Sequence, residues 1–172
     1  AYLSNGFNKV TKVRHAELAV NGDFTTPVLS AELLNVVDGD GQFNASGANW
    51  SVYGTGVTET WAADAGASGG GLVIDVDTTS TDPQGVQLPT TRFATLSAGE
   101  TYRVSVDLIA ATSADGVGFV IGLGGEESAP FNITTSYATY TKDITVTSDD
   151  ILTVYNTNAE TGVGDVSWRM DN

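Results

Sequence analysis

The 172-residue chain contains no cysteine, a single histidine and only seven basic residues against 21 acidic ones. The absence of cysteine excludes disulfide bonds, a cysteine nucleophile and thiolate metal sites. No run of about 18 apolar residues occurs, so the sequence predicts no membrane span. The net charge of −14 disfavours nucleic acid as a partner, because its phosphates would be repelled.

Glycine, threonine, serine and valine are abundant, and 41% of the residues are hydrophobic, which suits one domain with a buried core. Seven or more short stretches have strand character and are separated by turn-forming clusters such as SAGE, SADG and TSDD. This pattern predicts an all-β fold, an antiparallel β-sandwich. The only short helix candidate is 30–37, within a stretch (26–49) that is interpreted as an inserted loop.

The clearest strand is TYRVSVDLIAA (101–111), in which apolar and polar residues alternate with a period of two. Its polar, outward-facing residues are expected to be Arg103, Ser105 and Asp107. The core of the sandwich is expected to include Trp50, Leu72, Ile74, Val104, Val106 and Leu108.

Charge is unevenly distributed along the chain. Residues 1–16 hold three basic residues and no acidic one, whereas residues 17–172 hold four basic and 21 acidic residues, a net charge of −17. The sequence therefore predicts an extended basic N-terminal arm (1–16) that anchors an acidic domain (17–172) to other protein subunits. A frayed terminus without a function is the alternative. The residues expected to form the anchor are Phe7, Lys9, Lys12 and Arg14.

An ordered set of motifs runs along the domain: NGDF (21–24), NWSVYGTG (49–56), GGGLVIDV (69–76), GVQL (85–88), LSAGETYRVSVDLIA (96–110), TSYATYTKDITV (135–146) and VSWRMDN (166–172). In this order they resemble the carbohydrate-binding modules of the xylan-, glucan- and cellulose-binding group, which accompany glycoside hydrolases. The resemblance covers about residues 18–172. It implies a two-sheet jelly roll in which one sheet is concave and carries the sugar cleft.

Sugar sites combine an aromatic face with polar side chains that bind hydroxyl groups. Trp61 is the first candidate for the aromatic platform and Tyr53 the second, although Trp61 could instead belong to the core. Trp50 and Trp168 are expected in the core. The polar residues expected on the binding sheet are Gln87 or Gln84, Arg103, Ser105 and Asp107, together with Tyr155 or Asn156.

The resemblance also implies a structural calcium ion that ties the first strand to the last. Its expected ligands are Asp171 and the segment after Asn-Gly, where Thr25 stands in place of the family's usual glutamate and Asp23 is a substitute ligand. Independently, DGDG (38–41) resembles the start of a calcium-binding loop, with a plain tight turn as the alternative.

No catalytic constellation is found in the sequence. The single His15 lies in the arm, and no G-x-S-x-G motif is present. GLGGEE (122–127) lacks the lysine of a phosphate-binding loop and is interpreted as a turn that follows a strand. The protein is therefore predicted not to be an enzyme.

Two functions fit these observations. The favoured one is a surface protein of a larger assembly, such as a decoration or fibre protein of a bacteriophage virion, that adheres to cell-surface glycans. The alternative is a carbohydrate-binding module of a secreted glycoside hydrolase. The lack of a recognisable leader, catalytic domain or Pro/Thr linker favours the first. Either function implies a location on a virion surface or outside the cell.

Overall fold

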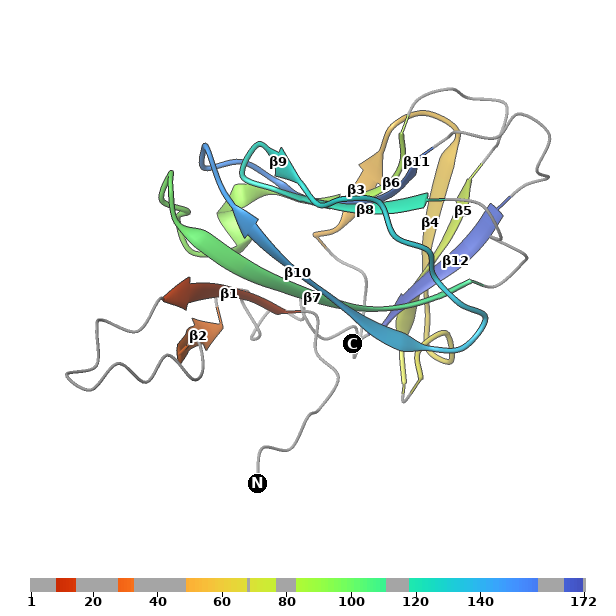
Figure 1. Cartoon of the computed structure of the whole chain (residues 1–172). Helices are drawn as coiled ribbons and strands as arrows, with labels where there is room; N and C mark the ends of the chain where they lie inside the picture. Colours follow the sequence, from red (N-terminus) through yellow and green to blue (C-terminus); the bar gives the residue numbers. More distant parts are fainter. Residues whose placement is uncertain are drawn as a thin grey trace.

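The computed structural model of the chain describes residues 9–14, 28–32, 49–67, 69–76, 83–110, 118–157 and 166–171. Their strands form two antiparallel sheets that face each other, with β8 and β11 above β7 and β10 in Figure 1. Among these residues no helix is long and apolar enough to cross a membrane. The predicted antiparallel β-sandwich is confirmed.

The five-stranded sheet has the strand order β3-β6-β11-β8-β9. Its strands are β3 (Ser51–Tyr53), β6 (Gln84–Leu88), β11 (Leu152–Thr157), β8 (Gly118–Leu123) and β9 (Glu126–Glu127). Val86, Val154 and Ile121 lie opposite one another on the three central strands and are fully buried. Alternate residues of these strands therefore point away from the core.

The seven-stranded sheet has the order β2-β1-β7-β12-β5-β4, and β10 also pairs with β7. Its strands are β2 (Val28–Glu32), β1 (Lys9–Arg14), β7 (Thr101–Ala110), β12 (Val166–Asp171), β5 (Gly71–Val76), β4 (Val57–Ala62) and β10 (Ala138–Thr145). Strand β10 pairs with Thr101–Leu108 of β7, whereas β1 pairs with Thr101–Ser105 and β12 with Asp107–Ala110. Strands β1 and β12 therefore follow one another along the side of β7 opposite β10. A single 3-10 turn, η2 (Thr90–Arg92), lies between β6 and β7.

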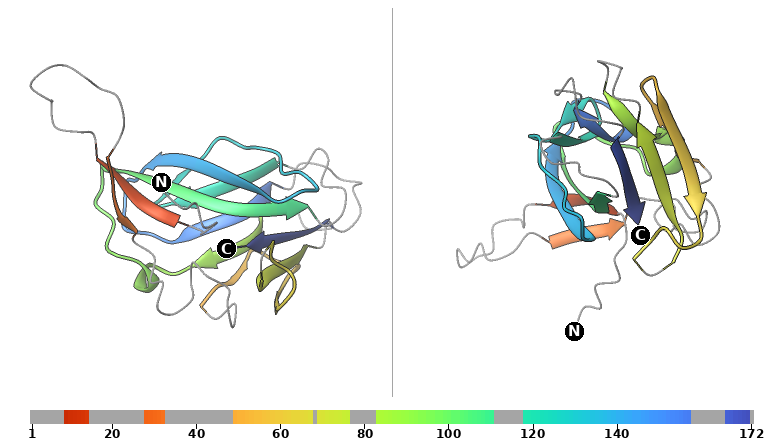
Figure 2. Two further views of the ribbon diagram at one scale, coloured as in Figure 1. Left: turned by 90° about the horizontal axis from the view of Figure 1, so that it is seen from below. Right: turned by 90° about the vertical axis from the view of Figure 1, so that its right-hand side faces the viewer.

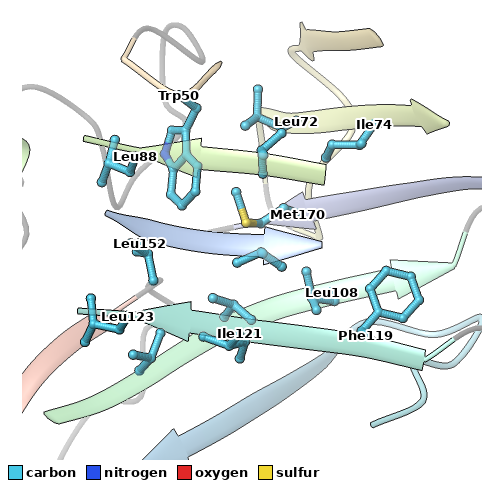
Figure 3. Close-up of a cluster of buried hydrophobic side chains, with 14 of the residues drawn as sticks. Trp50, Leu72, Ile74, Leu88, Leu108, Phe119, Ile121, Leu123, Leu152 and Met170 are labelled. Carbon is cyan, nitrogen blue, oxygen red and sulfur yellow. The ribbon is translucent and has the colours of Figure 1, made fainter. Parts of the chain in front are cut away.

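The core lies between the two sheets, as Figure 3 shows. In β7 the side chains alternate between buried and half-buried, as the period of two predicts. Phe119 of β8 meets Trp168 of β12 edge to face, with ring centroids 5.4 Å apart, so the two sheets interlock through aromatic rings. The predicted core is confirmed, since six residues are at most 4% exposed: Trp50, Leu72, Ile74, Val104, Val106 and Leu108.

The basic segment near the N-terminus forms part of the sheet. Lys9–Arg14 pair with β7 of the same chain as strand β1, which lies beside β7 in the left view of Figure 2. Val28–Glu32 pair with β1 as strand β2. Residues 30–32 of the short helix candidate (30–37) are therefore a strand, and the interpretation of 26–49 as a loop is wrong over β2. Phe7 lies outside the described residues, and anchoring to another chain stays a prediction.

Candidate functional site

Two tyrosines meet on the outer face of the five-stranded sheet. Tyr53 of β3, Gly85 of β6 and Tyr155 of β11 lie opposite one another across three neighbouring strands. The ring centroids of Tyr53 and Tyr155 are 5.4 Å apart, and the ring planes are tilted by 41°. Tyr155 is buried, whereas Tyr53 is half-buried. Tyr53 is therefore the more exposed ring of the two, and Tyr155 packs against it.

Gly85 makes this approach of the two rings possible. A Cβ atom at this position would collide with the backbone carbonyl oxygen of Val154 and would lie 2.7 Å from the Cβ atom of Tyr155. No side chain can therefore stand between the strands at this point. Gly85 therefore permits a close approach of β6 and β11.

An open hollow of about 150 Å³ lies beside Tyr53 on the same face. Gly122 of β8 forms part of its lining, and a Cβ atom there would collide with Oγ1 of Thr153. The absence of a side chain at Gly122 therefore makes the hollow deeper at this point of the sheet. The full lining is Tyr53, Gly122, Leu123, Gly125, Glu126, Glu127, Asp150, Ile151 and Thr153.

Burial and the nearby carboxylate of Glu127 raise the pKa of Tyr155 above its usual value, so the phenol stays neutral. Glu127 of β9 therefore lies near Tyr155 of β11 at the edge of the hollow. Ser51, Gln87 and Thr153 form the neighbouring outward row across β3, β6 and β11, so polar side chains lie next to the tyrosine pair.

Three polar residues predicted for the binding sheet belong to the other sheet. Arg103, Ser105 and Asp107 lie on β7, on the outer face of the seven-stranded sheet. Arg103 donates two hydrogen bonds of 2.7 Å from Nε and Nη2 to Asp143 of β10, which raises the pKa of Arg103 and lowers that of Asp143. The Ser105 hydroxyl lies 3.1 Å from that of Thr141. The prediction that these three residues share a face with Tyr53 and Gln87 is wrong.

Trp61 also lies away from the tyrosine face, which is the outer face of the five-stranded sheet that carries Tyr53 and Tyr155. On β4, Val57, Glu59 and Trp61 are opposite the buried Val76, Ile74 and Leu72 of β5. Side chains opposite each other point to the same face of a sheet, so Trp61 points inward and packs against the core while partly buried. The alternative of a core position for Trp61 is correct: Trp61 belongs to the same sheet as Arg103 but points to its inner face.

The predicted metal ligand Asp171 is 1% exposed at the end of β12. Its Oδ2 atom accepts a hydrogen bond from the backbone N–H of Ala67, and its Oδ1 atom is buried without a hydrogen-bond partner among the described residues. Tyr137 donates to the carbonyl oxygen of Ala65 nearby. Burial and the charge of Asp171 raise the pKa of Tyr137 to about 12. Asp23 and Thr25 lie outside the described residues, as does DGDG (38–41).

Several residues of the tyrosine face were missed by sequence reasoning. Glu126, Glu127 and Asp150 were not candidates, and Tyr155 was named only as an alternative to Asn156. Asn156 points into the core opposite Gln84, so Tyr155 is the outward choice. The acidic pair that ends GLGGEE was the available signal, because a tight turn after β8 places Glu127 opposite the outward-facing Gly122.

No family model and no curated protein sequence matches the chain. Among solved structures it is similar to the CBM22-1 xylan-binding domain of Xyn10C from Paenibacillus barcinonensis. That match has a TM-score of 0.55 and 15% identity, and covers 76% of this chain and 87% of the domain. A CBM4 structure matches with a TM-score of 0.50 and 18% identity, covering 77% of this chain and 94% of that one.

The MgGH51 α-L-arabinofuranosidase matches with a TM-score of 0.57 and 13% identity. The match covers 98% of this chain and 27% of the enzyme, so this chain spans about a quarter of the enzyme's length. At identities this low the likeness shows the fold. The chain has the jelly-roll fold of carbohydrate-binding modules, as the sequence resemblance implied.

Proposed function

We propose that the protein is a non-catalytic glycan-binding module and that its ligand lies on the outer face of the five-stranded sheet. The observation that carries this proposal is the half-buried Tyr53 ring, supported by Tyr155 beside an open hollow. A sugar ring stacks on an aromatic face that is held in place, and hydroxyl-binding groups at its edge orient it. The similar Paenibacillus domain is described as xylan-binding, which supports a polysaccharide as the ligand.

The row next to the tyrosines supplies the polar groups that such a site needs. Gln87 and Thr153 lie opposite each other in this row, beside Gly85 and Tyr155. Gln87 is half-buried and carries both a donor and an acceptor, so it can bind the hydroxyl groups of a sugar stacked on Tyr53. Of the polar residues predicted from the sequence, this proposal retains Gln87 and Tyr155.

Titration calorimetry with xylan and β-glucan oligosaccharides tests the proposal, with Tyr53→Ala and Arg103→Ala as the matched pair of variants. We expect Tyr53→Ala to lose roughly five- to thirtyfold in affinity with little change in melting temperature, because one stacked aromatic ring contributes on the order of 1–2 kcal/mol. Arg103→Ala should bind as the wild type does, because Arg103 lies on the other sheet. Equal affinities for Tyr53→Ala and wild type, or no binding across a broad glycan array, would refute the site.

We propose further that the protein is displayed on a larger assembly outside the cell, such as a bacteriophage virion, through residues 1–16. A module of a secreted glycoside hydrolase is the alternative setting. The supporting observation is the segregation of charge, because three of seven basic residues precede Glu17 in a chain of net charge −14. Such a segment is attracted to acidic neighbouring subunits.

Removal of residues 1–8 tests the anchoring role while leaving strand β1 in the chain. We expect the shortened protein to stay folded and to be lost from the assembly, with Phe7 supplying the apolar contact that the deletion removes. The basic residues should mainly set the salt dependence of attachment, since exposed ion pairs contribute little each. Normal attachment of the shortened protein would show that the terminus has no anchoring role.

We also propose that a structural calcium ion binds at Asp171. The buried Oδ1 atom of Asp171 without a partner supports this, because a buried carboxylate oxygen needs a donor or a cation. Asp23 and Thr25 are the further ligands that the sequence resemblance implies. Bound calcium would neutralise charge between the first and last strands of the domain.

A further inference from the structure

None of the seven basic residues of the chain belongs to a strand of the sheet that carries the tyrosine pair. Six of them belong to strands of the seven-stranded sheet, and the seventh lies in the 3-10 turn η2. The basic residues are Lys9, Lys12 and Arg14 in β1, Arg92 in η2, Arg103 in β7, Lys142 in β10 and Arg169 in β12.

Negative charge, in contrast, gathers at the hollow beside Tyr53. Glu126, Glu127 and Asp150 all line it, and all three side chains are exposed. Glu127 pairs with Gly122 across β9 and β8, so at least one carboxylate has a defined strand position at the hollow. A ligand stacked on Tyr53 therefore meets carboxylates and, within the five strands of this sheet, no cation.

We propose that the tyrosine face selects its glycan by charge and prefers chains that carry free amines, such as β-1,4-linked glucosamine. This inference rests on the proposed glycan-binding function and adds the chemical class of the ligand. An ammonium group beside an exposed carboxylate gains up to about fivefold in affinity for each pair. A uronate carboxylate at the same position is repelled. The face therefore discriminates against acidic polysaccharides.

Three β-1,4-linked hexamers of glucose configuration provide the test, because they differ only in their substituents: the glucosamine hexamer, cellohexaose and the glucuronic acid hexamer. We expect the glucosamine hexamer to bind about tenfold more tightly than cellohexaose at low salt, with two pairs formed. The difference should shrink toward equality at about 1 M salt, where charges are screened within a few ångströms. The glucuronic acid hexamer should bind most weakly.

Two double variants, each removing two negative charges, separate a local effect from the overall charge. Glu126→Gln with Asp150→Asn changes the hollow, and Asp64→Asn with Asp75→Asn changes exposed positions outside the five-stranded sheet. We expect the first to lower the ratio of its affinities for the glucosamine hexamer and cellohexaose to a fraction of the wild-type ratio. The second should keep the preference.

The possible failures are distinguishable. If the wild type binds no oligosaccharide, the proposed glycan-binding function fails, and this inference fails with it. If a neutral oligomer binds and the glucosamine hexamer is not preferred, this inference alone is overturned. Equal loss of preference in both double variants would assign the effect to net charge and would also overturn the inference.

Discussion

At the scale of single residues, the packing of the tyrosine face depends on the missing side chain at Gly85. Gly85→Ala would place a methyl group against the backbone of β11, which cannot move without disturbing the sheet. We expect a loss of about 1–3 kcal/mol in the free energy of unfolding, as for other overpacked sites. Urea denaturation measures it.

Gly69→Ala is the matched control for this substitution. A Cβ atom at Gly69 would have no neighbour within 4 Å, so this variant should unfold within about 0.5 kcal/mol of the wild type. Equal unfolding midpoints for Gly85→Ala and Gly69→Ala would contradict the close approach of Tyr53 and Tyr155 over Gly85.

The Arg103–Asp143 pair allows a pH prediction. Its side chains are 28% and 42% exposed, so we expect Asp143→Asn to cost no more than about 1 kcal/mol at pH 7. Arg103 lowers the pKa of Asp143 in the folded protein below its ordinary value of 3.8. The stabilisation is therefore complete above the ordinary value and is lost as the pH falls through the lowered pKa.

Unfolding of the wild type and of Asp143→Asn between pH 2 and pH 6 measures this contribution. The difference between the two proteins should be constant above about pH 5 and vanish toward pH 2. A difference that grew as the pH fell would show that Arg103 does not stabilise the charged form of Asp143.

At the scale of strands, the alternation in β7 was sufficient to predict which residues are buried. It was not sufficient to predict the site, because an alternating strand has the same pattern in either sheet of a sandwich. Arg103 and Gln87 both read as outward-facing residues, yet they lie on different sheets. Sheet membership depends on pairing between distant strands, which no local pattern encodes.

Trp61 shows a second limit of local patterns. In VTETWA (57–62) the inward row contains Glu59, because β4 is an edge strand whose inward residues are only partly covered. Burial of the Glu59 side chain raises its pKa. A charged residue in the inward row hides the alternation that would have placed Trp61 in the core.

The pairing of β1 with β7 of the same chain can be tested with an engineered disulfide, because the chain has no cysteine of its own. Lys9 lies opposite Ser105 in the pairing of β1 with β7. Lys9→Cys combined with Ser105→Cys should form a disulfide within one chain on oxidation, and the product should run as a monomer on a non-reducing gel. A covalent dimer would show instead that β1 pairs with β7 of a neighbouring copy.

At the scale of the whole molecule, the proposed calcium ion links the ends of the domain. A ligand bound only by the folded state raises its stability by mass action, about 2.7 kcal/mol at a hundredfold excess over Kd. We therefore expect a chelator to lower the melting temperature by several degrees and Asp171→Asn to abolish that effect. An unchanged melting temperature in excess chelator would exclude a stabilising ion.

The two sheets of the molecule differ in charge and in role. Residues of both signs, including all but one of the basic residues, belong to the seven-stranded sheet, whereas the five-stranded sheet carries the tyrosine pair and no cation. The fold alone does not specify a ligand. The functional claim therefore rests on which of the two outer faces receives the glycan.

That choice can be read directly from the backbone amide resonances of the isotope-labelled protein during titration with a neutral β-1,4-linked hexasaccharide. If the glycan binds at the proposed site, we expect chemical-shift changes concentrated at Tyr53, Gly85, Gly122 and Tyr155, on the outer face of the five-stranded sheet. We expect no comparable changes along β7 and β10. Changes centred on Arg103, Ser105 and Asp107 would contradict the proposed site and place it on the seven-stranded sheet.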